Sequence, residues 1–282
     1  MTNILKGNLV AKSIKEDMTK RIEELAKKDK YPKLAIVRLG EDPSDVSYER
    51  SIIKNCDNLD IRWEVFQRER SISTDDLVGL IEELNNNNEI SGILVFRPLP
   101  NQIDEEAIRN ALSPLKDVDC MNPLNLERIF EGKMDGFAPG TPKAAMEILK
   151  YNKIDLEGKN VVVINRSMVV GKPLAMMLLN ENATVTICHS RTKNLQDITK
   201  NADVVIPALG NPGFFGKEYF SEDSIIIDVG VSVNDQGKLS GDVDFDPVSA
   251  LVDKITPVPG GVGSVTTSIL LDQVVQACEN FQ

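Results

Sequence analysis

The chain has 282 residues, of which 41% are hydrophobic and 27% charged, and its formal net charge at pH 7 is −11. This length suits one large domain or two smaller ones, and the composition is typical of a soluble globular protein. The net negative charge argues against a general nucleic-acid binder, and no apolar run reaches the roughly 18 residues of a membrane span. The first residues lack the apolar core of a signal peptide. We therefore expect a cytoplasmic protein that binds neither nucleic acid nor a membrane.

The cysteines and the single histidine suggest no metal site. Cys56, Cys120, Cys188 and Cys278 are scattered along the chain, without paired spacing. This pattern favours reduced thiols in a cytoplasmic protein. Because no cluster of cysteine and histidine occurs, we expect no metal ligands.

The first third of the chain alternates between helical and strand patterns. Apolar residues recur at helical spacing from Val10 to Leu25, which predicts an amphipathic first helix. The following elements are predicted as a strand over 34–39, a helix from the turn at 40–44 to about 58, a strand over 61–66, a helix over 75–84, a strand over 91–96 and a helix over 104–112. Thr74 is the expected N-cap of the helix that begins at Asp75.

The regular pattern lapses between Pro114 and Gly140. The runs Lys116–Asp119 and Asn122–Asn125 are rich in turn-forming residues, and Asp135–Gly140 resembles a linker. A stretch of this length without regular structure is usually functional. Thr141 and Pro142 are then expected to cap a helix that runs to about residue 151.

Residues 158–192 predict a strand, a turn, a helix and a second strand. The unbroken apolar run over 161–164 is typical of a strand buried on both faces of a parallel sheet. Gly171 opens the helix, and Pro173 lies in its first turn, where a missing N–H has no cost. A second buried strand is expected over 183–188. Such a unit is a parallel crossover, which should be right-handed.

The turn before Gly171 is a candidate anion site, because helix N–H groups at the carboxyl end of a strand point toward an arriving anion. The usual GxGxxG pattern is absent, so a crossover that binds nothing remains the alternative. The second strand ends at Ser190 and Arg191 rather than at an acidic residue, and Arg166 lies in the preceding turn. Two cations and a hydroxyl suit a 2′-phosphate, which favours NADP over NAD. Exposed arginines can also simply be solvated.

The alternation of strands and helices resumes after residue 191. We expect a helix over 195–200, strands over 203–208 and 224–229, and a final helix over 266–281, with an irregular region that begins at Gly241. The loop 255–263 combines proline with glycine, so its backbone can approach a ligand closely, or it can be a tight connection between domains. The whole pattern predicts an α/β fold.

Nine short stretches of the chain together resemble one known family. They are Pro43–Tyr48, Gly92–Val95 with Pro98–Pro100, Lys116–Asp119, Thr141–Lys143, Arg166–Pro173, Cys188–Thr192, Asp228–Gly230, Gly241–Val243 and Thr256–Gly263. Each stretch is weak by itself, but nine in the right order over nearly the whole chain are specific. On these motifs the chain resembles the methylenetetrahydrofolate dehydrogenase/cyclohydrolase family.

The resemblance implies two α/β domains around a cleft, the second of them Rossmann-like. Residues 1–140, rejoined by the C-terminal helix 265–282, would form a folate-binding catalytic domain, and residues 141–264 would form the NAD(P)-binding domain. Members of the family are usually homodimers. They oxidise 5,10-methylenetetrahydrofolate to the 5,10-methenyl cation, commonly with NADP, and many then hydrolyse that cation to the 10-formyl form.

The resemblance also implies the site residues. Tyr48 would stack on the folate rings, and Asp119 would accept hydrogen bonds from the pterin N–H groups, a role that suits a carboxylate. The folate site would be lined by Pro98, Leu99 and Pro100 and by residues 258–263, which include Pro259, Gly260 and Gly261. The cofactor would be bound by Asn165, Arg166, Ser167, Val170, Gly171, Ser190, Arg191, Gly230 and Val231.

The chain departs from the family at the residues of one chemical step. The family's tyrosine is followed four residues later by a catalytic lysine, but that position is Ile52 here. Lys54 lies two residues further on, which turns a side chain by roughly 200° around a helix. The glutamine that holds the lysine is replaced by Phe96. Smaller changes put Cys120 and Asn165 at glycine positions, and Ser264–Val265 in place of Pro-Met.

These departures predict that one of the family's two activities is lost. Hydrolysis of the methenyl cation needs a proton to be moved, and neither Ile52 nor Phe96 can carry one. Hydride transfer depends mainly on positioning and needs no general base. We therefore expect a dehydrogenase without cyclohydrolase activity. Two alternatives remain open, a bifunctional enzyme in which Arg50, Arg97 or Lys54 supplies the proton, and a non-catalytic folate-binding subunit.

Overall fold

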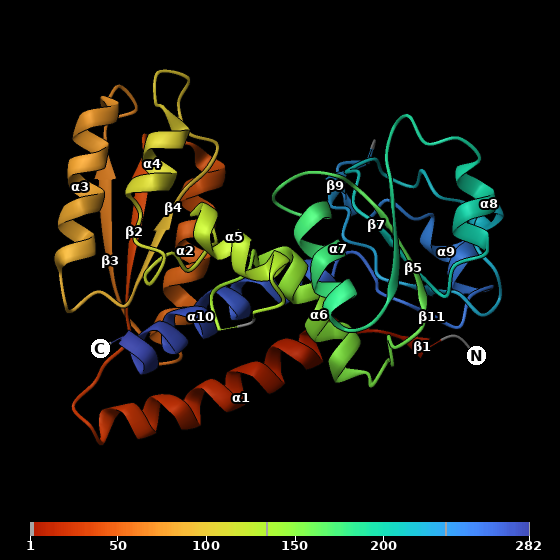
Figure 1. The fold of residues 1–282 in the computed structure, drawn as a ribbon, viewed down its shortest axis with the longest axis horizontal. Coiled ribbons are helices and arrows are strands. Elements are labelled where there is room, and N and C mark those ends of the chain that lie inside the picture. Colours follow the sequence, from red (N-terminus) through yellow and green to blue (C-terminus); the bar gives the residue numbers. More distant parts are fainter. Residues whose placement is uncertain (1–2, 134, 235, 282) are drawn as a thin grey trace. The chain divides into compact units, whose positions relative to one another are not determined.

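The structure, a computed structural model, describes residues 3–133, 135–234 and 236–281. The chain forms two compact α/β units (Figure 1). One comprises Met1–Lys12 and Pro139–Thr266, and we call it the six-stranded unit; the other comprises Ser13–Ala138 and Thr267–Gln282, and we call it the three-stranded unit. The α/β prediction is thus confirmed. The start of the chain differs from the expected division, because strand β1 (Asn3–Ile4) pairs with β11 (Lys254–Ile255).

The three-stranded unit is built around a parallel sheet with the strand order β3-β2-β4. The strands are β2 (Lys33–Leu39), β3 (Arg62–Arg68) and β4 (Gly92–Val95). The helices are α1 (Gly7–Ala26), which begins in the six-stranded unit, α2 (Pro43–Asp57), α3 (Thr74–Asn86), α4 (Glu105–Ala111), α5 (Pro123–Phe130) and α10 (Thr266–Phe281).

Two hydrophobic clusters cover the two faces of this sheet. Leu34 and Ile36 of β2 pack with residues of α1, α2 and α10, whereas Ala35 and Val37 pack with residues of α3 and α4. Successive residues of a strand point to opposite faces, so one strand supplies both clusters. This is why the apolar run at 34–37 is unbroken in the sequence.

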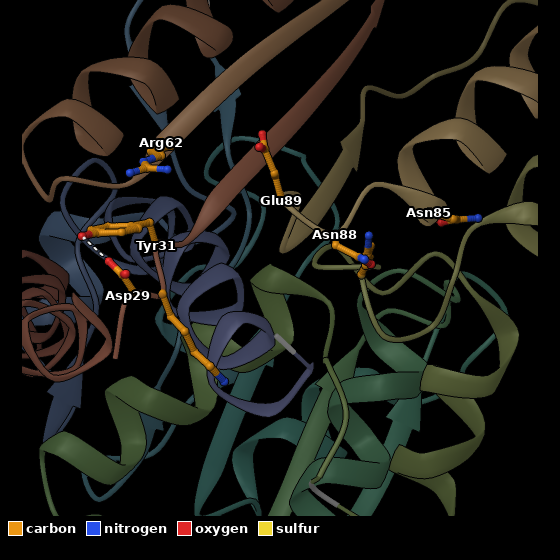
Figure 2. Close-up of a pocket in the computed structure, with 8 residues that line it drawn as sticks. Asp29, Tyr31, Arg62, Asn85, Asn88 and Glu89 are labelled. Carbon is orange, nitrogen blue, oxygen red and sulfur yellow. Dashed lines mark hydrogen bonds between the residues drawn. The ribbon is translucent and has the colours of Figure 1, made fainter. Parts of the chain in front are cut away.

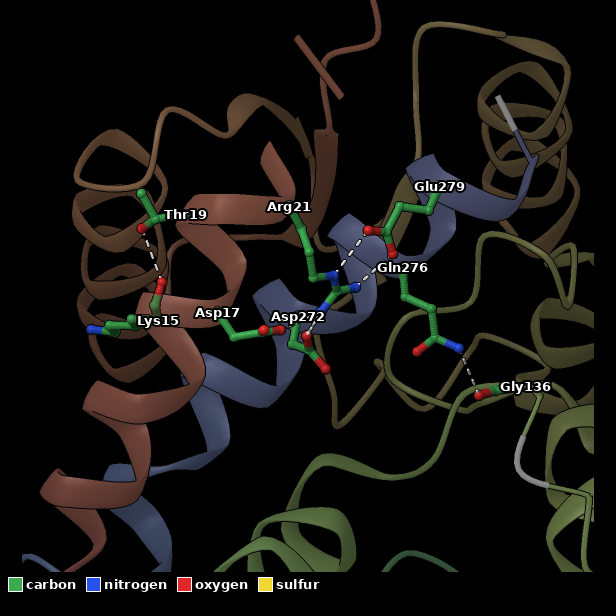
Figure 3. Close-up of polar contacts among 8 residues, drawn as sticks. All are labelled: Lys15, Asp17, Thr19, Arg21, Gly136, Asp272, Gln276 and Glu279. Carbon is green, nitrogen blue, oxygen red and sulfur yellow. Dashed lines mark hydrogen bonds and ion pairs between the residues drawn. The ribbon is translucent and has the colours of Figure 1, made fainter. Parts of the chain in front are cut away.

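Arg21 joins the first and last helices of this unit, although they are far apart in the sequence (Figure 3). Its guanidinium lies 2.6 Å from the Asp272 carboxylate and 2.7 Å from that of Glu279, with Asp17 at 3.4 Å. The hydrogen bond to Glu279 and the charges around it raise the pKa of Arg21. Helix α10 is therefore tied to α1 by charge as well as by its apolar face.

The six-stranded unit has the strand order β1-β11-β8-β7-β5-β6, with every pair parallel. Its remaining strands are β5 (Asn160–Ile164), β6 (Thr184–Cys188), β7 (Val204–Pro207) and β8 (Ile225–Ile226), and β9 (Ser232–Val233) forms a separate antiparallel pair with β10 (Leu239–Ser240). The helices are α6 (Gly140–Tyr151), α7 (Gly171–Asn180), α8 (Leu195–Lys200) and α9 (Phe245–Ser249), with 3₁₀ turns η1 (Lys217–Tyr219) and η2 (Val262–Ser264).

Most predicted helices and strands are confirmed, but four local predictions are wrong. Ser73, not Thr74, caps α3, because its hydroxyl accepts the Asp76 N–H at 3.1 Å. The run at 122–125 starts helix α5, since the Asn122 side chain accepts the Leu124 N–H and a proline occupies the first turn. Helix α6 begins at Gly140 without a side-chain cap. Strand β6 is mostly exposed, with Cys188 buried, because it forms an edge of the sheet.

Candidate active site

In the three-stranded unit, the candidate site lies at the carboxyl ends of the strands. The parallel register pairs Val37 of β2 with Val95 of β4, so the segments that follow the two strands start at the same edge of the sheet. Helix α2 follows β2, and it carries Tyr48 and Ile52 four residues apart, on one face. Phe96 and Arg97 directly follow β4.

Tyr48 offers an accessible aromatic ring beside Phe96. Its side chain is 43% exposed, and the two ring centroids are 5.6 Å apart with an interplanar angle of 36°. Partial burial and the negative charge of Asp119 raise the pKa of Tyr48 to about 12. The residue is therefore a neutral phenol near pH 7, and its ring can stack on a flat ligand.

A hydrogen-bonded turn positions Asp119. The Asp117 carboxylate accepts the N–H groups of Met121 and Asn122, each at 2.8 Å, and burial raises the pKa of Asp117 to about 7. Gln273 of α10 donates to the Val118 carbonyl at 2.7 Å. These hydrogen bonds fix the backbone on either side of Asp119. The Asp119 carboxyl group takes no part in them and is available to other side chains and to a ligand.

Asp119 forms an ion pair with Arg97. The Arg97 Nη2 atom donates to Asp119 Oδ2 at 2.7 Å, and the side chains are 25% and 29% exposed, respectively. Burial raises the pKa of Asp119, while the positive charge and hydrogen bond of Arg97 oppose this rise. The sequence provided Asp119 as a site residue, but it did not show that Arg97 would be its partner.

The two positions at which the family resemblance predicts a lysine and a glutamine are apolar and buried. Ile52 is 0% exposed, and it belongs with Phe96 to one hydrophobic cluster. Lys54 is exposed, in agreement with its expected turn around α2. Position 52, at which the family resemblance predicts a lysine, is therefore part of the hydrophobic core of this unit.

The Pro98–Pro100 segment leaves the sheet through a cis peptide between Arg97 and Pro98. Pro98 is exposed, Leu99 is half-buried and Pro100 is buried. Pro98 and Leu99 are thus accessible to a ligand, whereas Pro100 contributes mainly to packing.

Among the described residues of this unit, a pocket lies near each end of the sheet. The first, of 620 Å³, is lined at the amino ends of β2 and β3 by Tyr31 and Arg62, whose guanidinium lies 4.1 Å from the tyrosine ring (Figure 2). No predicted site residue lines it. The second, of 460 Å³, is lined by Arg38 at the carboxyl half of β2 and by Ser47 and Arg50 of α2, which flank Tyr48. The second pocket is therefore the one that adjoins the predicted site.

In the six-stranded unit, three turns converge at the carboxyl edge of the sheet. Ile164 of β5 pairs with Cys188 of β6 and with Pro207 of β7, so the turns after these strands begin side by side. Arg166, Ser167, Ser190 and Arg191 lie on the first two turns, and all four are exposed. The structure thus brings together the cations and hydroxyls that the sequence suggested for a phosphate.

Asn165 holds the first of these turns together. Its Oδ1 accepts the N–H groups of Ser167 at 2.8 Å and of Gly171 at 3.1 Å, and its Nδ2 donates to the Ala208 carbonyl at 2.6 Å. A Cβ atom at Gly171 would lie 2.1 Å from the Asn165 carbonyl oxygen, so the turn requires glycine at that position. The Asn165 side chain therefore stabilises the turn at the candidate cofactor edge through hydrogen bonds to its backbone.

The expected use of helix N–H groups for an anion is wrong for the first residues of α7. The Gly171 N–H is donated to Asn165, the Lys172 N–H is donated to the Ser167 carbonyl at 3.0 Å, and Pro173 has none. A phosphate at this edge would be bound by the exposed side chains and by the backbone of the turn before the helix. Val170, which precedes the helix, is half-buried.

Two buried carboxylates, which the sequence analysis did not single out, organise the rest of this edge. Asp242 accepts the N–H groups of Leu209 and Asn211, and Asp228 accepts those of Gly230 at 3.0 Å and Val243 at 3.0 Å. Burial raises the pKa of Asp228 to about 7.

Gly230 and Val231 depend on this arrangement. A Cβ atom at Gly230 would lie 2.2 Å from the Asp242 carboxyl carbon, so a side chain would displace the carboxylate. Val231 is 50% exposed. The sequence signals for the two carboxylates were the motifs Asp228–Gly230 and Gly241–Val243.

The proline- and glycine-rich loop follows β11 in the same unit. It contains a cis peptide between Val258 and Pro259, and Gly260 has a φ of 99°, which favours glycine. The Gly7 N–H donates to the Gly260 carbonyl at 2.8 Å. Pro259 and Gly260 are exposed and Gly261 is buried. Contact of this loop with folate remains a prediction.

The described residues form neither a metal site nor a membrane span. No group of three or more His, Cys, Asp or Glu residues within 3–133, 135–234 and 236–281 could hold a metal ion. Over the same residues, no helix has the length and apolarity that crossing a membrane requires. All four cysteines are buried and free.

Comparison with known proteins gives matches over nearly the whole chain. Residues 5–119 match the catalytic domain, and residues 139–282 the NAD(P)-binding domain, of the family described as tetrahydrofolate dehydrogenase/cyclohydrolase. The bifunctional protein FolD of Clostridium botulinum is 57% identical over 279 residues, or 99% of each chain.

Two solved structures extend these matches to the fold. The bifunctional enzyme FolD of Campylobacter jejuni is 38% identical, with a TM-score of 0.97 over 100% of both chains. The Trypanosoma brucei dehydrogenase-cyclohydrolase, solved with NADP and an inhibitor, is 32% identical, with a TM-score of 0.91 over 99% of this chain and 97% of the other. Motifs, fold and matches agree, and this chain belongs to the tetrahydrofolate dehydrogenase/cyclohydrolase family.

Proposed function

We propose that this chain is an NADP-dependent 5,10-methylenetetrahydrofolate dehydrogenase that lacks methenyltetrahydrofolate cyclohydrolase activity. The family membership supports the dehydrogenase. The observation that carries the second part is the apolar pair Ile52 and Phe96, because Ile52 is 0% exposed and both belong to one hydrophobic cluster. We also propose that the protein is a cytoplasmic homodimer, as the family resemblance and the cysteine pattern suggest.

The three-stranded unit is the proposed folate-binding catalytic domain. The exposed face of the Tyr48 ring stacks on the folate rings, and the Asp119 carboxylate accepts hydrogen bonds from the pterin N–H groups. Pro98 and Leu99, which follow β4 at the carboxyl edge of the sheet, provide accessible apolar surface. Contacts of Pro259, Gly260 and Gly261 with folate are part of the same proposal.

The six-stranded unit is the proposed NADP-binding domain. Arg166, Ser167, Ser190 and Arg191 are exposed at one edge of its sheet, a donor set that suits a phosphate monoester. The Trypanosoma brucei relative was solved with NADP, which supports this choice of cofactor. NADP would supply the hydride acceptor, and the side chains of this edge would bind and orient it.

The two reactions place different demands on the protein. In the oxidation, the lone pair of a folate nitrogen expels the hydride and the product cation is resonance-stabilised, so positioning is the main requirement. In the hydrolysis, water must be activated and a proton moved. An isoleucine and a phenylalanine can position a substrate, but they cannot transfer a proton.

A bifunctional enzyme is the second candidate, and the names of the relatives favour it. The relatives from Clostridium botulinum and Campylobacter jejuni are both described as bifunctional. A displaced proton carrier would have to be Arg50, Arg97 or Lys54. Arg97 is paired with Asp119, Lys54 points away from the Ile52 face of α2, and Arg50 lines the pocket beside Tyr48. Guanidinium groups stay protonated in proteins, so neither arginine is a suitable carrier.

One reaction followed in two ways distinguishes these candidates. The protein is supplied with methylenetetrahydrofolate and NADP, and reduced nicotinamide and the methenyl product are measured together, with correction for spontaneous hydrolysis. We expect the two to rise in equal amounts. Reduced nicotinamide without accumulation of the methenyl product would show that hydrolysis survives.

Restoring the two lost side chains provides the complementary test. The Ile52→Lys, Phe96→Gln variant should gain measurable hydrolysis, because burial lowers the pKa of a lysine toward the range of a proton shuttle. The matched control is Ile53→Lys with Phe96→Gln, which places the amine on a neighbouring face of α2. Thermal unfolding of both variants is measured first, since a buried lysine is destabilising. A folded double variant that oxidises folate but gains no hydrolysis contradicts our explanation.

A further inference from the structure

The ion pair between Arg97 and Asp119 leaves half of the carboxylate available. Only one hydrogen bond joins the side chains, from Arg97 Nη2 to Asp119 Oδ2 at 2.7 Å. Among the residues that the structure describes, none donates a hydrogen bond to Oδ1. A carboxylate has about four lone-pair sites on its two oxygens, so Asp119 can accept further N–H groups while Arg97 stays in place.

We propose that Arg97 is a positioning residue for the dehydrogenase, which keeps Asp119 ionised and fixed through Oδ2 so that Oδ1 is presented to the N–H groups of the pterin. This inference rests on the proposed function of Asp119. It assigns to Arg97 a role in substrate binding that acts through the carboxylate and not through direct contact with folate.

The surroundings of Asp119 explain why a cation is needed there. Four titratable groups interact electrostatically with Asp119. They are Tyr48 of α2, Asp117 and Cys120 of its own turn, and Arg97 after β4. Tyr48 and Cys120 are neutral near pH 7, since burial raises the pKa of both, and Asp117 brings negative charge when ionised. Arg97 is the cation of this group, and it opposes the effect of burial.

Protonation of Asp119 would remove the charged hydrogen-bond acceptor that the pterin N–H groups require. Because Oδ2 accepts from Arg97, the proton would be taken up at Oδ1, which would then be a donor instead of an acceptor, and the carboxyl group would lose the charge that strengthens its hydrogen bonds. An opposite charge within about 4–6 Å lowers the pKa of a carboxyl group by roughly 1–3 units. Arg97 thereby widens the pH range in which Asp119 is a double acceptor. The same pairing keeps the guanidinium away from proton transfer.

The test compares Arg97→Leu, Arg97→Lys, Asp119→Asn and the Arg97→Leu, Asp119→Asn double variant. Arg62→Leu is the matched control, because it removes an arginine from the opposite end of the same sheet. Two properties are measured on the full chain after the fold of each variant is verified by circular dichroism. One is the pH titration of Asp119 without substrate, by NMR of carboxyl-labelled aspartate assigned with Asp119→Asn. The other is the pH profile of KM and kcat with methylenetetrahydrofolate.

We expect the Asp119 titration to move to higher pH by about one unit in Arg97→Leu, to recover largely in Arg97→Lys and to stay unchanged in Arg62→Leu. The acid limb of kcat/KM should move by the same amount, with a roughly tenfold higher KM on that limb and little change in kcat. In the Asp119→Asn background, Arg97→Leu should have no further effect on KM, because both act through one group.

Three results would overturn the inference: an Asp119 titration that Arg97→Leu leaves in place, a titration that moves while KM does not, and a full additional loss in the Asp119→Asn background, which would mean direct contact between Arg97 and folate. A wild-type protein without dehydrogenase activity would refute the proposed function, and the substrate-free titration would still decide whether Arg97 keeps Asp119 ionised.

Discussion

The two candidate sites of this protein are built in opposite ways. In the three-stranded unit two of the three decisive groups belong to the hydrophobic core, Ile52 within α2 and Phe96 directly after β4, and the third, Asp119, lies on a turn that Asp117 stabilises. In the six-stranded unit the candidate ligand groups, such as Arg166 and Arg191, are exposed on turns.

The difference shows where each kind of substitution acts. At the proposed folate site, our proposal makes the choice of reaction depend on two buried side chains, Ile52 and Phe96, which belong to the hydrophobic core. At the proposed cofactor edge, Asn165 and Asp242 hold the turns through hydrogen bonds, and the side chains proposed to contact the ligand are exposed. A substitution there acts either on affinity alone, if the residue is exposed, or on the turn itself, if it is buried.

The largest effect is expected for Asp119→Asn, which tests the folate site directly. Asparagine keeps one neutral acceptor oxygen but has a donor NH2 group in place of the other oxygen, so both charge-assisted hydrogen bonds to the pterin are weakened or lost. Because each is worth roughly 1.5–3 kcal/mol, kcat/KM for methylenetetrahydrofolate should fall about 100-fold. NADP affinity, measured by fluorescence titration, should not change. The control is Asp75→Asn, on the first turn of α3. Retained folate turnover would mean that the pterin is bound by another residue.

An intermediate effect is expected for Asp242→Ala, which tests the scaffold of the cofactor edge. The substitution leaves the Leu209 and Asn211 N–H groups without their acceptor, which should lower the free energy of unfolding by about 2 kcal/mol. NADP affinity should fall with it, while folate binding is retained. Urea unfolding and NADP titration measure the two effects, with the exposed Asp246→Ala as control. Unchanged stability would contradict the bracing role of this carboxylate.

The smallest effect is expected for Arg191→Ala, which tests the exposed groups of the same edge. Losing one charge-assisted hydrogen bond to a 2′-phosphate should raise the KM for NADP about tenfold, with no change in stability. The KM for NAD, which has no such phosphate, should stay the same. Lys193→Ala removes an exposed cation two residues away and serves as control. An equal rise of KM for NADP and for NAD would show that Arg191 does not bind the 2′-phosphate.

The sequence by itself determined the α/β class, the positions of most elements and the family. Unbroken apolar runs, such as 34–37 and 161–164, are typical of strands buried on both faces of a parallel sheet, and both runs form such strands here. That Ile52 shares a face of its helix with Tyr48 was also predictable from the sequence, because a four-residue spacing fixes which side chains lie on one face; that a proton carrier belongs at this position is what the family resemblance implies.

Only the tertiary structure decided the partners that come from distant segments. Arg97 and Asp119 are 22 residues apart, and Asp242 reaches Leu209 and Asn211 across 33 and 31 residues. The placement of residues 3–12 with the six-stranded unit depends on pairing between β1 and β11. Such contacts follow from how strands are ordered in a sheet, which periodicity cannot encode. For the same reason β6 looked like a buried strand from its composition, but its place at the sheet edge leaves Thr184, Thr186 and Ile187 exposed.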